Sequence, residues 1–234
     1  MSRYSDLKTR LSSVEILRLI KEEHSYEELS PLLGLSAPIL SRYVKGHILP
    51  SLERSKRILE ASMEQVSDLI RKKIRFEDER VFDHSAVIYN PNLLEKIGKL
   101  AFYEFGSIKV DKVLTVETDG IPLAAQVGRE FNVSFVVAKN RKEMGIRDFI
   151  EVKRVFISGA YSYLFIPKGS IEQGEHVLIV DDAVRTGFTL ETLLELCRRC
   201  GAKPAGIYTI ICFEDTLRRL EQKLNCPVKV LVRI

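Results

Sequence analysis

Residues 177–189, VLIVDDAVRTGFT, decide the fold of this 234-residue chain. Four consecutive apolar residues, three of them β-branched, indicate a strand that is buried on both faces of a sheet. Asp181 and Asp182 follow at the point where we expect the strand to leave the sheet, and a short loop contains Thr186, Gly187 and Thr189. Apolar residues then recur at helical spacing from Leu190 onward. The stretch therefore predicts a strand, a loop and a helix.

The residues after this strand combine two kinds of binding group. A helix N-terminus offers unpaired N–H groups and a partial positive charge, and Gly187 lets the backbone approach an anion closely. Asp181 and Asp182 are acceptors, which suit neighbouring sugar hydroxyls or a hydrated Mg²⁺ rather than a phosphate. A phosphate loop beside two acids predicts a site for a phosphorylated ribose. The alternative is an acidic strand end before a helix, without a ligand.

The stretch resembles the phosphoribosyl-pyrophosphate (PRPP) motif of the type I phosphoribosyltransferases. The resemblance implies that Asp181 and Asp182 bind the 2- and 3-hydroxyls of the ribose, and that Mg²⁺ enters with PRPP rather than by direct ligation to the protein. It also implies that the 5-phosphate lies in a loop formed by Ala183, Val184, Arg185, Thr186, Gly187, Phe188 and Thr189. Arg185 departs from the family, which usually has a small residue there, and would either clamp the phosphate or crowd the site.

Further strands and helices alternate on both sides of this stretch. Strands are expected at residues 112–116, 133–138, 161–166, 205–213 and 228–234, and helices at 93–105, 121–131 and 216–224. Alternation of this kind predicts an α/β domain with a doubly wound, mostly parallel sheet, which binds ligands at the carboxyl ends of its strands. The resemblance to the phosphoribosyltransferases covers residues 85–234.

Two further segments are candidates for binding pyrophosphate. The resemblance assigns this role to the turn after the strand at 112–116, which consists of Glu117, Thr118, Asp119 and Gly120. Beyond the strand at 133–138, three cations would neutralise a pyrophosphate or would form a solvated loop. They are Lys139, Arg141 and Lys142. The family places a mobile flap next, at about residues 143–160.

The amino-terminal segment predicts short helices. Ser25 and Glu28 form a capping-box pattern that starts a helix ending near Gly34, and Ser36 caps the next one. Pro31 is expected to kink or shorten the first of these helices. Two short helices joined by a glycine-containing turn have the geometry of a helix-turn-helix.

Residues 27–51, EELSPLLGLSAPILSRYVKGHILPS, resemble the helix-turn-helix of the bacteriophage-repressor superfamily. The resemblance implies that the second of the two helices enters the major groove of double-stranded DNA. The candidate DNA-binding residues are Ser36, Ala37, Pro38, Ser41, Arg42, Lys45 and His47, whereas Ile39, Leu40, Tyr43 and Val44 are candidates for packing. The alternative is a helical dimerisation module whose charges are only a solvated face.

These segments predict a helix-turn-helix domain at residues 1–50, a helical connector at 51–84 and a phosphoribosyltransferase-like domain at 85–234. The connector, helical from residue 52 to about residue 80, would link two DNA-binding heads in a homodimer or would simply pack on its own domain.

Composition excludes several classes of protein. The chain has a formal net charge of +4, no apolar run of the length that a bilayer requires, and no apolar signal segment in MSRYSDLKTR. We therefore expect a cytoplasmic protein with no membrane partner. Two of the four cysteines, Cys197 and Cys200, form a C-x-x-C pair, but the sequence offers no second pair of ligands for a metal site. We interpret these two, and likewise Cys212 and Cys226, as reduced thiols.

The pattern as a whole resembles purine-operon-repressor-like regulators and archaeal regulators built on orotate-phosphoribosyltransferase-like domains. It predicts a DNA-binding transcriptional regulator that senses PRPP or a nucleotide-type ligand. The alternative is an active purine phosphoribosyltransferase of nucleotide salvage, which transfers phosphoribosyl from PRPP to a nucleobase with Mg²⁺. In a weaker version of the enzyme hypothesis, the amino-terminal helices serve only for assembly.

Overall fold

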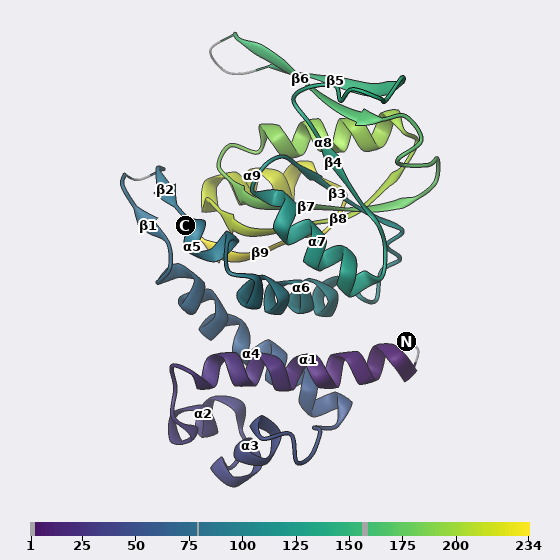
Figure 1. The fold of residues 1–234 in the computed structure, drawn as a ribbon. Coiled ribbons are helices and arrows are strands. Elements are labelled where there is room, and N and C mark those ends of the chain that lie inside the picture. Colours follow the sequence, from purple (N-terminus) through teal and green to yellow (C-terminus); the bar gives the residue numbers. More distant parts are fainter. Residues whose placement is uncertain (1–2, 79, 156–158) are drawn as a thin grey trace. The chain divides into compact units, whose positions relative to one another are not determined.

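The computed structural model describes residues 3–78, 80–155 and 159–234. By its internal contacts the chain forms two compact units, Met1–Val87 and Ile88–Ile234 (Figure 1). Within the described ranges, no helix combines the length and the apolar character needed to cross a membrane.

The first unit is built from helices and a short hairpin. The helices are α1 (Arg3–Lys21), α2 (Tyr26–Leu33), α3 (Ala37–Val44) and α4 (Leu52–Arg71), and strands β1 (Arg75–Phe76) and β2 (Phe82–Asp83) pair antiparallel. α1 packs along α4, and the short helices α2 and α3 pack on each other and on this pair. The core lies between the helices and contains Ile16, Leu17, Ile20, Leu29, Leu40, Ile58, Leu59 and Val66.

Helix α4 occupies the segment that we predicted as a connector. It packs against α1 inside the first unit, through an apolar face that includes Ile58, Leu59 and Val66. The helix ends at Arg71 rather than near residue 80, because the chain turns at Ile74 and pairs β1 with β2. The helical prediction was therefore too long by about two turns.

The predicted capping box at the start of α2 is confirmed. The Ser25 hydroxyl accepts a bond from the backbone N–H of Glu28 at 3.2 Å, and the Glu28 carboxylate accepts one from the backbone N–H of Ser25 at 2.7 Å. Pro31 lies inside α2, which ends two residues later at Leu33. Gly34 then takes a positive φ of 62°, which a residue with a side chain rarely adopts.

The second unit contains the predicted parallel sheet. Its strands lie in the order β4-β3-β7-β8-β9, and every neighbouring pair in it is parallel. The elements, after α5 (Ser85–Ile88) at the boundary of the units, are α6 (Pro91–Phe105), β3 (Lys112–Val116), α7 (Gly120–Phe131), β4 (Phe135–Ala138), β5 (Phe149–Val155), β6 (Tyr161–Pro167), β7 (His176–Val184), α8 (Phe188–Arg199), β8 (Lys203–Cys212), α9 (Glu214–Lys223) and β9 (Val228–Arg233).

Helices cover both faces of this sheet, as a doubly wound fold requires. α6 and α7 lie on one face and α8 on the other, with the β5–β6 hairpin beyond α8 (Figure 1). On the first face, Phe105 of α6 packs edge-on against Tyr208 of β8, whose hydroxyl donates to the carbonyl of Ile97 at 3.0 Å. Gly206 permits this packing, because a Cβ atom there would collide with the Phe105 ring.

The strand predicted at residues 161–166 does not join the main sheet. It forms β6, which pairs antiparallel with β5 in a separate hairpin. No helix lies between β5 and β6 in the described residues, and a parallel neighbour requires a crossover connection of that kind. This hairpin spans the segment where the family places its flap; residues 156–158 of that segment lie outside the described residues.

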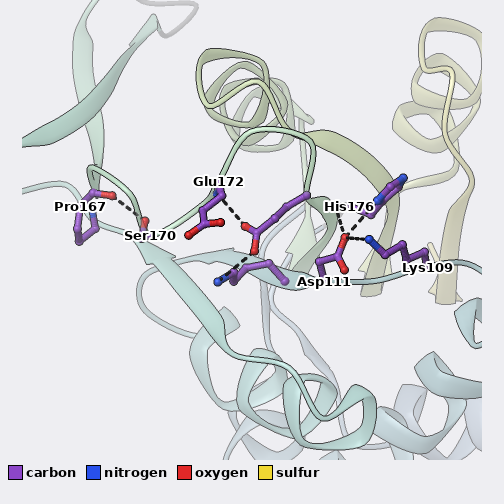
Figure 2. A network of polar contacts seen from close by, with 8 residues as sticks. Lys109, Asp111, Pro167, Ser170, Glu172 and His176 are labelled. Carbon is purple, nitrogen blue, oxygen red and sulfur yellow. Dashed lines mark hydrogen bonds and ion pairs between the residues drawn. The ribbon is translucent and has the colours of Figure 1, made fainter.

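A charged network joins the beginnings of β3 and β7, at the edge of the sheet opposite the carboxyl ends of its strands (Figure 2). The Asp111 carboxylate accepts bonds from the backbone N–H of His176 at 2.9 Å and from Lys109 Nζ at 3.0 Å, and it also lies 3.1 Å from His176 Nδ1. The His176 backbone bond, followed by the Lys109 bond, lowers the pKa of Asp111 to about 2.

We expect Asp111→Asn to lower the stability of the protein only where Asp111 is ionised. Because the folded pKa lies below the unfolded value of 3.8, the carboxylate contributes stability that is present above that value and is lost as the pH falls toward 2. Urea unfolding from pH 7 down to pH 3 should show a difference between the variant and the wild type that shrinks with the pH. Glu172→Gln is the control nearby. A difference that stays constant with pH would contradict this role.

Candidate ligand-binding site

The acid pair lies inside strand β7, not beyond its end as we expected. β7 pairs with β8 as far as Val184 and Cys212, but it pairs with β3 only as far as Ile179 and Leu114. The edge of β7 that faces β3 is therefore unpaired from Val180 onward, while the edge that faces β8 stays paired. This asymmetry places Asp181 at the carboxyl edge of the sheet, on a strand that remains hydrogen-bonded.

Asp181 is the more buried of the two acids, with 4% of its surface exposed, whereas Asp182 is half-buried. The Asp182 backbone N–H donates to Asp181 Oδ1 at 3.1 Å. Burial, and then the charge of Asp182, raise the pKa of Asp181 well above its usual range. A neighbouring donor or cation would relieve this cost, and the donor set of two carboxylates suits ribose hydroxyls or a hydrated Mg²⁺.

The predicted pyrophosphate turn lies directly beside Asp181. Gly120 begins α7, and a Cβ atom at this position would collide with Thr115 Oγ1 and lie 3.2 Å from Asp181 Oδ1. The peptide between Glu117 and Thr118 is cis. Glycine at position 120 thus lets the turn approach the acid pair, so that residues distant in sequence share one site.

The predicted phosphate loop borders a pocket of about 250 Å³. The loop itself is short, because β7 extends to Val184 and α8 already begins at Phe188. Gly187 takes a φ of 80° at the start of α8. The pocket is lined by Asp181, Ala183, Val184, Arg185, Thr186, Gly187, Thr189 and Leu190. Arg185 is exposed at this pocket, and Phe188 lines a second pocket between α8 and β5.

Helix α9 holds the backbone of this loop. The Thr216 hydroxyl donates to the carbonyl of Arg185 at 2.9 Å, and Arg219 donates to the carbonyl of Thr186. In a trans peptide the N–H points opposite to the carbonyl. The amides that follow these two carbonyls therefore point away from α9, in the orientation that an anion-binding loop needs. Sequence reasoning missed both α9 residues, because they lie about 30 residues from the loop.

The predicted cations after β4 are partly engaged within the protein. Lys139 pairs with Glu143, and Lys142 pairs with Glu151 at 3.0 Å and lies over the ring of Phe165. These ion pairs are exposed, so they exchange readily with other partners. Arg141 is also exposed. The three cations remain predicted pyrophosphate ligands.

Asn140 and Arg154 belong to the same region, although we did not predict them. The Glu117 carboxylate accepts bonds from the backbone N–H of Asn140 at 2.7 Å and from its Nδ2 at 2.8 Å. Arg154 Nη2 donates to Asn140 Oδ1 at 3.3 Å, and its Nη1 donates to Thr189 Oγ1 at 3.5 Å. Burial lowers the pKa of Arg154, but an arginine at this depth stays charged.

In the first unit, helix α3 and the residues that flank it carry the side chains predicted to contact DNA. Among them, Ser36, Pro38, Arg42, Lys45 and His47 are exposed, and Ala37 and Ser41 are half-buried. The predicted packing residues Leu40 and Tyr43 are buried, whereas Ile39 and Val44 are half-buried.

Arginines of neighbouring helices hold α3 in place. Arg18 of α1 donates to the carbonyl of Val44 at 2.7 Å, at the C-terminal end of α3, and Arg54 of α4 donates to the Tyr43 hydroxyl at 3.1 Å. Neither arginine was predicted from the local pattern.

The cysteines fit the interpretation as reduced thiols. All four are free; Cys197 and Cys212 are buried, and burial raises the pKa of Cys197 to about 12.

The parallel sheet, with the acid pair and the loop before α8 at its carboxyl edge, defines a doubly wound α/β domain, a class that binds ligands at this edge. The model of the phosphoribosyl transferase domain family matches residues 84–234. The chain therefore belongs to the type I phosphoribosyltransferase family.

Relatives of this chain carry names of two kinds. The probable purine biosynthesis transcriptional regulator PurR of Streptococcus pneumoniae is 34% identical over 127 residues, which span 53% of this chain and less than half, 46%, of that protein. The hypoxanthine/guanine phosphoribosyltransferase of Methanotorris igneus is 29% identical over 147 residues, 63% of this chain and 78% of that enzyme.

Solved structures share the fold of the second unit. The crystal structure of adenine phosphoribosyltransferase from Rhodothermus marinus superposes with a TM-score of 0.64 at 21% identity, covering 73% of this chain and 99% of that one. Likeness at this level of identity supports the fold alone.

Proposed function

We propose that this protein is a DNA-binding transcriptional regulator whose phosphoribosyltransferase domain binds PRPP or a nucleotide-type ligand. The observation that carries the proposal is the joining, in one chain, of a phosphoribosyl-type pocket beside Asp181 with a helical unit that exposes Arg42 and Lys45 on a short helix. Nucleobase chemistry has no need of such a helical unit. A regulator needs both parts.

Ligand binding follows from the chemistry of the pocket. Asp181 and Asp182 accept hydrogen bonds from the ribose hydroxyls, and the backbone amides around Thr186 hold the 5-phosphate. The turn at residues 117–120 and the three cations Lys139, Arg141 and Lys142 receive the pyrophosphate. Mg²⁺ would enter with PRPP and would neutralise part of the charge of the pyrophosphate; Asp181 and Asp182 are the acids that would face it.

DNA binding would use α3 as the helix that enters the major groove. Arg42 lies on the exposed face of α3, and Lys45 and His47 follow its C-terminal end, where they reach phosphates. A regulator of this type acts as a homodimer, because two heads at a fixed separation read a palindromic site. A ligand changes DNA affinity only if it favours one arrangement of the two heads.

A second candidate function is supported by the enzyme-named relatives and by the pocket that joins Asp181 to the predicted phosphate loop. In this version the protein transfers phosphoribosyl from PRPP to a purine base, with catalysis by positioning and electrostatics. Incubation with PRPP, Mg²⁺ and each nucleobase, with pyrophosphate release as the readout, separates the two candidates. Rapid turnover with one base would exclude a purely regulatory role.

We expect Arg42→Ala with Lys45→Ala to weaken binding to an operator fragment from the protein's own upstream region by about 10- to 100-fold. Each lost phosphate contact also lowers the slope of log K against log salt concentration by about one. Fluorescence anisotropy between about 50 and 300 mM salt, over which the Debye length falls to less than half, measures both quantities. The control, Arg218→Ala with Lys168→Ala, removes the same charge from the second unit. Equal loss in both double variants would mean that α3 has no special role.

A further inference from the structure

Helix α9 packs directly against the loop that joins β7 to α8. A Cβ atom at Gly187 would lie 3.3 Å from Leu220 Cδ2 and 3.6 Å from Thr216 Cγ2. Thr216 and Leu220 are buried, with 3% and 1% of their surfaces exposed. The backbone of the loop therefore lies on α9 with little room for a side chain between them, and the conformation of the loop depends on this helix.

The position of α9 is set by the sheet and does not require a ligand. The backbone N–H of Glu214 donates at 2.7 Å to the carbonyl of Ile234, directly after β9. The backbone N–H of Phe213 donates at 3.4 Å to the carbonyl of Val184, the last residue of β7. Leu220 packs in the core of the second unit. Contacts that α9 makes with the loop are thus made from a fixed support.

The Thr216 hydroxyl has one proton and two acceptors within reach. It lies 2.9 Å from the carbonyl oxygen of Arg185 and 3.4 Å from Asp215 Oδ1, so the bond to Arg185 is the stronger one. Arg219 makes a similar contact with the carbonyl of Thr186, but Arg219 is exposed whereas Thr216 is buried. Because hydrogen bonds are stronger away from water, the hydroxyl is the firmer of the two constraints.

We propose that Thr216 is a positioning residue for the phosphate loop. It holds the peptide between Arg185 and Thr186 so that the Thr186 N–H faces away from α9 and is ready for the 5-phosphate before the ligand arrives. Thr216 is not among the residues that line the pocket, so it acts only through this peptide. This inference rests on the proposed phosphoribosyl-type ligand.

The physical basis is the planarity of the peptide. Without the hydroxyl, the Arg185 carbonyl loses its donor on α9 and turns to find another partner. The Thr186 N–H must turn with it, because both groups belong to one rigid plane. A donor that is already oriented need not be reordered when the anion binds, and this advance ordering contributes to affinity.

Calorimetric titration of the full-length protein with ribose 5-phosphate tests the role of the hydroxyl. Thr216→Val keeps the shape of the side chain and removes the donor. We expect the affinity to fall about tenfold, close to the effect of one charge-assisted hydrogen bond. Thr216→Ser keeps the donor and removes the methyl group, so its affinity should return to near the wild-type value.

Backbone amide NMR spectra give a readout that a loss of stability would not imitate. In the wild type, ribose 5-phosphate should shift the N–H signals of Thr186 and Gly187 downfield, as expected for amides that donate to an anion. In Thr216→Val the Thr186 signal should shift much less. The Gly187 signal should still respond, because Arg219 holds the carbonyl of the preceding peptide plane.

Thr192→Val is the matched control. The Thr192 hydroxyl is also buried and donates to a carbonyl near the loop, that of Phe188, at 2.8 Å. Phe188 is the first residue of α8, so helix geometry fixes its carbonyl without the hydroxyl. We therefore expect Thr192→Val to bind ribose 5-phosphate as the wild type does.

The outcomes distinguish this inference from the proposed function. If Thr216→Val folds, binds ribose 5-phosphate like the wild type and shows the same Thr186 response, the positioning role is overturned while the ligand stands. If Thr216→Val does not fold, the wild type decides, because a Thr186 signal that ignores the ligand overturns the role. A wild type that binds neither ribose 5-phosphate nor PRPP overturns the proposed ligand and this inference with it.

Discussion

Asp181→Asn is expected to weaken PRPP binding by about 10- to 100-fold and, at the same time, to stabilise the protein without ligand. Asp181 is almost completely buried beside a second carboxylate, and its raised pKa shows that its charge is costly in the folded state. Asparagine keeps the shape and removes the charge, which should raise the free energy of unfolding by about 1 kcal/mol. The ligand loses a charged acceptor for its ribose hydroxyls, and hence charge-assisted hydrogen bonds.

The two effects are measured separately. Calorimetric titration with PRPP and Mg²⁺ at pH 7.5 gives the loss of affinity, and thermal unfolding without ligand gives the gain in stability, which should be a few degrees in Tm. Asp182→Asn is the matched control: this acid is half-buried, so we expect a similar loss of affinity with a smaller gain in stability. If Asp181→Asn binds PRPP as tightly as the wild type, the acid pair does not hold the ligand.

Gly120→Ala is expected to damage both folding and binding. A Cβ atom at this position would overlap Thr115 Oγ1 and press on Asp181 Oδ1, and neither side chain can move away because both are buried on strands of the central sheet. Overpacking of this kind costs about 1–3 kcal/mol of stability. Because the displaced turn carries the predicted pyrophosphate ligands and the displaced acid belongs to the ribose site, PRPP affinity should fall more than tenfold.

A second substitution tests this mechanism. Thr115→Ala removes the atom that the new Cβ would strike, so the double variant Thr115→Ala with Gly120→Ala should recover part of the stability, with a coupling of about 1 kcal/mol in a double-mutant cycle. Urea unfolding of the four proteins gives this value. Strict additivity of the two substitutions would show that the overlap is not the cause.

The sequence predicted the local elements of the second unit well, since these depend on runs and periods within a few residues. The strand, loop and helix around Asp181 were found, as were the strand at Lys112–Val116 and the turn and helix that follow it. The parallel sheet follows from that alternation, and the structure confirms it. The hairpin of β5 and β6 was not foreseen, because pairing between strands is decided by partners rather than by the pattern inside each strand.

The site was predictable where it is continuous in sequence and not where distant segments meet. The pocket beside Asp181 is lined by most of the predicted loop. Asn140, Arg154, Thr216 and Arg219 were missed, because nothing in their own neighbourhoods marks them out and only the folded chain brings them to the loops. In the first unit the same holds for Arg18, which reaches the end of α3 from another helix.

The one-sided pairing of β7 bears on how the specificity of this domain could be changed. The backbone of Asp181 and Asp182 cannot shift without breaking the pairing of β7 with β8, so the positions of the two carboxylates are set by the sheet. The turn at residues 117–120 lies beside Asp181 on the edge of β7 that β3 leaves unpaired. If the domain binds the proposed ligand, we expect a change of ligand to require changes in this turn, while Asp181, Asp182 and the strand that carries them stay the same.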